Sequence, residues 1–142
     1  MQRILLNVLG TQKIDAQRDK MELTTIAAFE ENDTQYIIRY NEEQEPPLAP
    51  VKVCVTINKD ESYVEMTRTG AQNSCLTIEN SKRNLCHYGT EYGDILMGIS
   101  GHSIDLNYSA DEGEFNFAYD IDINGALVSK NEVKLKFQIN QE

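Results

Sequence analysis

Arg68 is the residue of this sequence whose type and position most suggest a role in binding. It lies near the end of a strand-like run over residues 62–69, in which side chains alternate between two faces. Val64 and Met66 mark the apolar face, and the same alternation turns Arg68 toward it. A guanidinium facing an apolar interior must be paired or lie near an opening, because an unpaired buried charge is costly. Arg68 is therefore a candidate anchor for an anionic or polar ligand.

Two structural roles for Arg68 stay open beside that functional one. The side chain can close one end of the fold through an ion pair, or its stem can lie along apolar surface with the charged head in water. Because long arginine side chains commonly do the latter, the sequence favours a structural role.

A second polar segment, Tyr88-Gly89-Thr90-Glu91-Tyr92-Gly93, places two tyrosines and a carboxylate close together in the chain. Glu91 is a candidate partner for Arg68, and Tyr88 and Tyr92 are candidates for lining the mouth of a pocket. Alternatively, the glycines permit a sharp bend, and the tyrosine rings cap the core with their hydroxyls in water. The structural alternative is again favoured.

No pattern in the sequence predicts a metal site or a catalytic centre. Cys86 and His87 are adjacent and would face opposite sides of a strand, and His102 lies in a Gly-His-Ser corner. Structural zinc usually needs four ligands at recognisable spacing. No G-x-S-x-G elbow, phosphate-binding loop or dinucleotide fingerprint occurs. We therefore expect no metal, no cofactor and no enzyme activity.

The charge balance limits the partners. Thirteen basic residues against 23 acidic ones give a formal net charge of −10. Such a field repels polyanions, and no basic stripe is visible along the sequence, so binding to nucleic acid or to an anionic membrane surface is disfavoured. A protein partner is compatible with an acidic surface.

The number and spacing of the cysteines, together with the N-terminal residues, indicate the cellular compartment in which the protein is expected. Cys54, Cys75 and Cys86 are odd in number and show no CxxC spacing, which suits reduced thiols. Asn7 interrupts the N-terminal apolar run, no cleavage site follows, and no stretch approaches the ~20 apolar residues of a membrane span. We expect a cytoplasmic protein whose residues 1–142 form a single domain.

Short alternating strands account for most of the chain. The clearest one covers residues 114–123, and Asn124-Gly125 after it gives a strong hairpin signal, because both residues tolerate positive φ. The only helical tendency is a weak one within residues 13–20. Residues 41–50 contain all three prolines and are expected to form an exposed loop. Strands are expected over residues 21–29, 36–40, 51–57, 62–69, 74–79, 84–88, 94–100, 103–109, 114–123, 126–129 and 133–139.

This pattern predicts an all-β fold, a single antiparallel β-barrel of about eight to ten strands. A barrel is favoured over a sandwich because closure removes exposed strand edges. The side chains expected to face inward are Met66, Leu76, Ile78, Ile95, Met97, Ile99, Phe115, Phe117 and Tyr119. The size of the aromatic members indicates that much of the interior is filled.

Two functions follow from such a barrel. The first is binding of a small, partly apolar or amphipathic ligand inside it, through Arg68, Tyr88, Glu91, Tyr92, Met66, Met97 and Tyr119. The second is a protein-interaction or regulatory module with a filled core and an acidic surface. The Pro- and Glu-rich residues 42–50 would be its contact element.

Three short motifs resemble the YwiB-like family of small bacterial proteins, which are grouped under a domain of unknown function. They are Y-I-I-R-Y at residues 36–40, T-R-T-G at 67–70 and Y-G-T-E-Y-G at 88–93. The family usually has R-S-G in the second motif and T-P-Y-G in the third, so Thr69 and Glu91 depart from its pattern. Residues 117–131 are similar to the family's final hairpin. The resemblance spans roughly residues 21–140 and implies a calycin-like, lipocalin-related barrel without an assigned activity.

Overall fold

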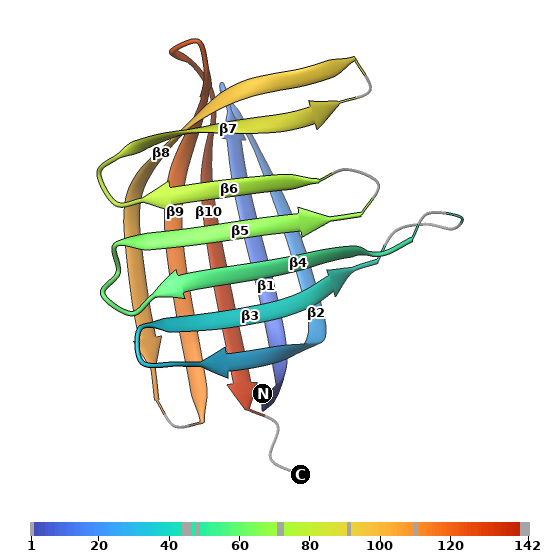
Figure 1. Ribbon diagram of the computed structural model, residues 1–142, viewed down its shortest axis with the longest axis vertical. Coiled ribbons are helices and arrows are strands. Elements are labelled where there is room, and N and C mark those ends of the chain that lie inside the picture. Colours follow the sequence, from blue (N-terminus) through green and yellow to red (C-terminus); the bar gives the residue numbers. More distant parts are fainter. Residues whose placement is uncertain are drawn as a thin grey trace.

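The computed structural model describes residues 2–43, 47, 49–70, 73–90, 92–109 and 111–139. Within these residues ten antiparallel strands form one closed barrel in the order β1-β10-β9-β8-β7-β6-β5-β4-β3-β2 (Figure 1). The strands are β1 (Gln2–Ile14), β2 (Gln17–Glu31), β3 (Gln35–Glu42), β4 (Val51–Asn58), β5 (Tyr63–Thr69), β6 (Ser74–Glu79), β7 (Arg83–Thr90), β8 (Gly93–Tyr108), β9 (Glu112–Ile123) and β10 (Ala126–Ile139). The all-β barrel predicted from the sequence is confirmed.

Strict alternation of apolar and polar residues fills the barrel interior. Along β4, Val51, Val53, Val55 and Ile57 are buried, while the residues between them face outward. The same period orients β1, β3, β9 and β10, so one continuous core forms between all the strands. Because each strand buries only one face, the outer face is mostly polar, although Leu5 and Ile26 are exposed on it.

Two strands are longer than the sequence predicted. Each of β8 and β10 was expected as two shorter strands, separated at Gly101-His102-Ser103 and at Lys130-Asn131. In β8 the pairing instead shifts register between Gly101 and Ser103, and β10 shifts between Leu127 and Ser129. A bulge adds one residue without ending the strand and increases its bend, so a long strand can curve around the barrel.

The N-terminal hairpin replaces the weak helical tendency over residues 13–20, and that expectation was wrong. β1 pairs with β2 along its whole length, and Asp15 in the turn has a φ of 53°. Ile4, Leu6 and Val8 of β1 are buried. The free energy gained by burying these side chains while β1 pairs with β10 and β2 favours a strand here, although the local sequence gives only a weak strand signal.

Five aromatic side chains fill one end of the barrel, next to the turns that join β2 to β3 and β8 to β9. The ring centroids of Phe29 and Phe137 are 5.0 Å apart, and so are those of Tyr36 and Phe115. Tyr108 packs edge-on against Tyr36 at 5.3 Å. Rings at such separations attract one another in addition to burying apolar area. This end of the barrel is closed by packed side chains.

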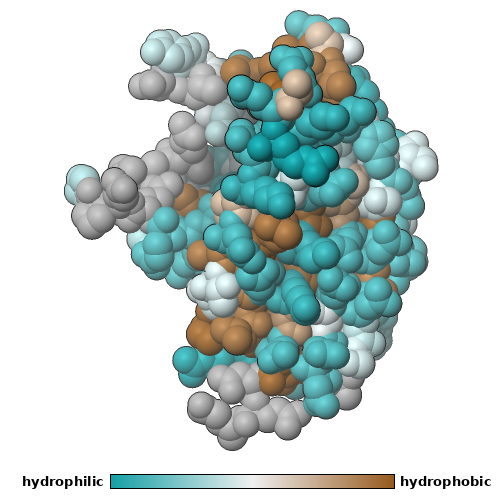
Figure 2. Space-filling model, turned by 180° about the vertical axis from the view of Figure 1, so that it is seen from behind, coloured by the Kyte–Doolittle hydropathy of each residue, from teal (hydrophilic) through white to brown (hydrophobic). Residues whose placement is uncertain are grey.

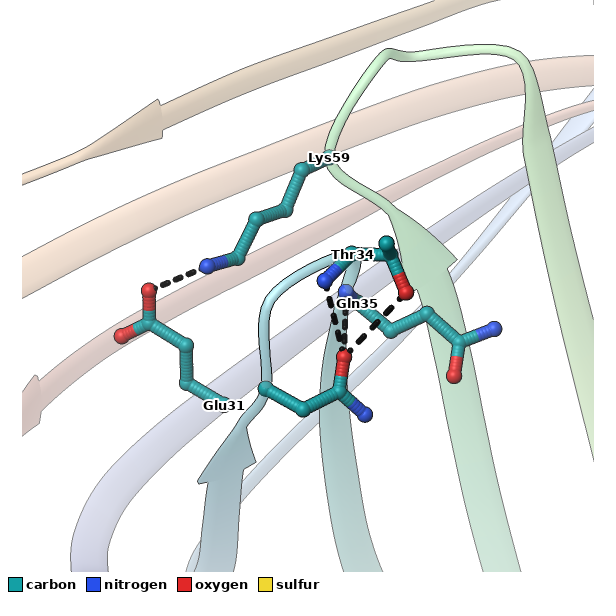
Figure 3. A network of polar contacts seen from close by, with 5 residues as sticks. Glu31, Thr34, Gln35 and Lys59 are labelled. Carbon is teal, nitrogen blue, oxygen red and sulfur yellow. Dashed lines mark hydrogen bonds and ion pairs between the residues drawn. The ribbon is translucent and has the colours of Figure 1, made fainter.

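Polar contacts brace the turns around the aromatic cluster (Figure 3). The Asn32 side-chain oxygen accepts hydrogen bonds from the backbone N–H groups of Thr34 and Gln35 at 2.9 and 2.8 Å. Lys59 pairs with Glu31 and lies 5.1 Å from the centre of the Tyr36 ring. These contacts tie the β2–β3 turn to the β4–β5 turn.

Two strand seams are short. β2 pairs with β3 only from Ala28 to Glu31, and β6 pairs with β7 only through Ser74 and Tyr88. At the second seam, the Cys86 thiol donates to the Cys75 carbonyl, and Gly101 of β8 exchanges backbone hydrogen bonds with Ser81 and Lys82. The barrel wall is therefore less continuous at both seams, and the β6–β7 seam has the fewer paired residues among those that the structure describes.

Gly113→Ala tests the aromatic end. A Cβ at this position would lie 2.3 Å from Cζ of Phe137, whose ring is held by its aromatic neighbours. We expect a loss of about 1–3 kcal/mol in the free energy of unfolding, as overpacked cores show. Urea denaturation measures it, with Gly89→Ala as control, because a Cβ there meets no atom closer than 3.6 Å. Equal effects of the two substitutions would contradict the packing described.

Candidate ligand-binding site

A pocket of about 270 Å³ opens into the half of the barrel away from the aromatic cluster. Residues of β1, β2, β3, β5, β6, β9 and β10 line it, many of them on the inward face, whose alternation continues beyond the packed rings. Its lining is Val8, Gly10, Thr11, Gln12, Asp19, Lys20, Met21, Tyr40, Met66, Arg68, Leu76, Tyr119, Asn131, Glu132 and Val133. The lining mixes apolar side chains, such as Val8 and Met66, with polar and charged ones, and a concave site of this kind can hold a small molecule.

Arg68 places a guanidinium on the wall of this pocket, whose lining also includes Lys20, Asp19 and Glu132, and it is paired with Glu42. Its Nη1 lies 2.6 Å from the Glu42 Oε2 atom, and both side chains are partly buried, at 34% and 21% exposure. The other carboxylate oxygen of Glu42 is buried and accepts no hydrogen bond from the described residues. The structure thus shows the ion-pair role among the alternatives, with the guanidinium still on the pocket wall.

Two tyrosines flank the ion pair. Tyr40 is 5% exposed, and its burial, together with the neighbouring Glu42 carboxylate, raises its pKa to about 12. Burial also raises the pKa of Tyr119, against the opposing effect of the Arg68 charge. Both phenols are therefore neutral near pH 7, where each hydroxyl can donate or accept a hydrogen bond.

Three of the residues expected to bind a ligand line this one pocket. They are Met66, Arg68 and Tyr119. Met97 packs against the core without reaching the pocket lining, and Tyr88 is half-buried in β7. Tyr92 is 95% exposed. Glu91, the expected partner of Arg68, lies outside the described residues.

Sequence reasoning missed three members of the site. Tyr40 and Glu42 continue the inward face of β3, although residues 41–50 were expected to form a loop. Counting the period two residues further along the strand would have found Glu42. Asn131 was assigned to a polar corner, yet it is 9% exposed and donates to the Ser129 hydroxyl at 3.0 Å. Ile95, expected to face inward, is instead 39% exposed.

A groove of about 500 Å³ lies on the barrel wall where β2 and β3 separate. Ile26 and Ala28 of β2 line one side, and Arg39 and Cys54 of β3 and β4 line the other. Tyr40 belongs to both this groove and the inner pocket. The short β2–β3 seam thus places a wall opening beside the inner site.

The described residues offer no alternative centre for metal chemistry, since no group of three or more His, Cys, Asp or Glu side chains is placed to hold an ion. Burial raises the pKa of the Cys75 and Cys86 thiols, which keeps both in the less nucleophilic protonated form. No helix in this part of the chain is long and apolar enough to cross a membrane.

A family model described as a domain of unknown function (DUF1934) matches residues 6–135. The chain belongs to this family. It is similar to the crystal structure of the ywiB protein from Bacillus subtilis, with a TM-score of 0.83 and 18% identity, over 99% of this chain and 93% of that chain. At this identity the likeness shows the fold. No curated protein matches the chain significantly. The YwiB-like resemblance of the three sequence motifs is thereby confirmed.

Replacing Tyr40 tests its buried position in this DUF1934 barrel. Because the pKa of Tyr40 is raised from 10.0 to about 12, the folded state holds this proton more tightly than the unfolded chain. The resulting stability is complete below pH 10 and is lost as the pH rises through about 12. Tyr40→Phe should remove up to roughly 2–3 kcal/mol of this alkaline loss. Urea denaturation of the wild type and of Tyr40→Phe across this pH range measures the difference, and an equal dependence of stability on pH in the two proteins would contradict the burial of Tyr40.

Arg68→Met and Glu42→Gln separate the two halves of the ion pair. Arg68→Met leaves the Glu42 carboxylate without its cation, so we expect a loss of about 1–2 kcal/mol in the free energy of unfolding, reduced by the partial exposure of both groups. Glu42→Gln keeps an acceptor for Arg68 and should lose less than about 1 kcal/mol. If chemical denaturation at neutral pH ranks the two variants in the opposite order, the pair does not hold this end of the barrel.

Proposed function

We propose that this protein binds one small, partly apolar molecule in the inner pocket, with a polar or anionic group of the ligand against Arg68. The observation that carries the proposal is the placement of Arg68, Tyr40 and Tyr119 on one wall of a pocket whose other walls include Val8 and Met66. An amphipathic ligand would bury its apolar part against these walls and hydrogen-bond at its polar end.

The pocket volume supports a ligand of modest size. About 270 Å³ is just below the ~300–1,000 Å³ of sites for drug-sized molecules. The aromatic cluster and buried aliphatic residues such as Ile38 and Val55 fill the rest of the interior, so a long chain would have to project through an opening. The groove beside Tyr40, where β2 and β3 separate, is a route of entry that breaks few ladder hydrogen bonds.

We also propose a cytoplasmic location. The three cysteines are free, and two of them lie on neighbouring strands without forming a bridge, as suits a reducing compartment.

Gly10→Leu tests the pocket without dismantling the barrel. Gly10 lies on the inward face of β1, and a Cβ added there meets nothing closer than 3.9 Å, so a larger side chain can enter the pocket space. We expect Gly10→Leu to fold, with unchanged circular dichroism, and to weaken binding of the anionic amphipathic dye 1-anilinonaphthalene-8-sulfonate by about tenfold or more, since apolar contacts are replaced. Gly89→Leu adds the same side chain outside the pocket lining and should bind the dye normally.

Native mass spectrometry of gently purified protein extends this test to a resident ligand. A reproducible bound mass in the wild type that is absent from Gly10→Leu supports the proposal. Protein that is empty in every preparation, with dye fluorescence equal in all three proteins, overturns it and favours the protein-interaction module with an acidic surface.

A further inference from the structure

The outer face of β2, β1 and β10 carries a row of three cations. In the strand register Lys13 is the direct neighbour of both Arg18 and Lys130, so the three side chains lie side by side across three strands. All three are exposed, and none forms an ion pair with another described residue. Lys20 lies two residues from Arg18 on the same face. Strongly hydrophilic side chains gather below the upper tip of this face (Figure 2).

This arrangement costs stability in the protein by itself. Directly opposite residues of paired strands have Cβ atoms about 4.5–5.5 Å apart, and like charges at that distance repel. Most other cations of the chain are paired: Arg39, Lys59, Arg68, Lys82, Arg83 and Lys134 each have a carboxylate partner. A row of unpaired cations that are direct strand neighbours, in a chain of net charge −10, is therefore a place where a counter-ion would relieve repulsion.

The row lines a surface hollow of about 450 Å³. Two carboxylates also line it: Asp120 and Glu132. Asp120 is the direct strand neighbour of Lys130 on β9, and its Oδ2 also lies 2.8 Å from Nε2 of His102. The cations outnumber the carboxylates, so the hollow can accept a small anion between Lys13, Arg18 and Lys130.

We infer that this hollow is a binding site for a compact phosphate-bearing molecule with two or three linked phosphate groups. Three neighbouring strands span about 10 Å, which matches a short chain of phosphates better than a single ion. Arginine and lysine are the side chains that bind phosphate oxygens by charge-assisted hydrogen bonds. A long nucleic acid would extend beyond the row over surface that carries the chain's negative charge, and is repelled there.

The site is separate from the inner pocket, although the two are neighbours. Thr11, Asn131 and Glu132 line both, whereas the three cations of the row line the hollow alone. The inference does not depend on the proposed function. Substitutions of Lys13, Arg18 or Lys130 leave Arg68 and Gly10 of the inner pocket unchanged, so the two sites can be tested separately.

Inorganic pyrophosphate, tripolyphosphate and ATP are the probes, with binding measured by isothermal titration calorimetry and melting temperature by circular dichroism. We expect saturable binding to the wild type, and a Kd weaker by about tenfold or more in Lys13→Gln and in Arg18→Gln, because each loses a charge-assisted hydrogen bond. Tighter binding of ATP than of tripolyphosphate would show that the ligand of this site is a nucleotide. Equal binding would show that the site recognises the phosphate chain alone. Lys52→Gln removes an exposed lysine of β4 and should bind like the wild type.

Ligand-free stability gives a second readout. Lys13→Gln should raise the melting temperature slightly without anion, since it relieves repulsion from both neighbours, while it abolishes the gain that pyrophosphate gives the wild type. Sodium chloride at matched ionic strength should not reproduce that gain. A gain that is equal in the wild type and Lys13→Gln, or equal with sodium chloride, overturns the inference, as does the absence of saturable binding.

Discussion

Aromatic packing at one end of the barrel is the interaction on which the rest of the structure depends. Phe29, Tyr36, Phe115 and Phe137 come from four strands, and their rings occupy the space that closure of the sheet leaves there. The packed rings and the braced turns fix the strands at that end. In the other half of the barrel, alternate side chains of the same strands continue to face inward. The side chains there do not fill the remaining space, and a pocket results.

The same packing explains why the barrel opens where it does. β2 and β3 are joined where the aromatic cluster and the Asn32 turn hold them, and they separate beyond Ala28 and Arg39. Arg68 and Glu42 then stabilise the open half together with buried residues such as Val8 and Met66. An ion pair in this position has partly exposed charges, so it can exchange its water or its partner for a ligand more readily than a sealed core could.

Electrostatics in this protein are decided by strand pairing as much as by composition. A net charge of −10 argues against polyanion binding, and along the sequence the cations are scattered. The register nevertheless brings Lys13, Arg18 and Lys130 into one row. Net charge governs the field at a distance, whereas a small ligand senses the few charges within a Debye length of about 8–10 Å.

The sequence by itself determined the fold class, the hairpin at Asn124-Gly125 and the inward orientation of Arg68, because period-two alternation and turn chemistry are local properties. It did not determine that β8 and β10 are continuous. The β8 bulge at Gly101–Ser103 looks like a strand end when only local polarity is read, and Lys130 and Asn131 stay paired within β10 although they are polar. The meeting of Arg68 with Glu42, the burial of Asn131 and the cationic row were decided only by the tertiary structure. Each depends on pairing between strands far apart in the chain, and barrel closure fixes that register through long-range hydrogen bonds rather than through any local preference.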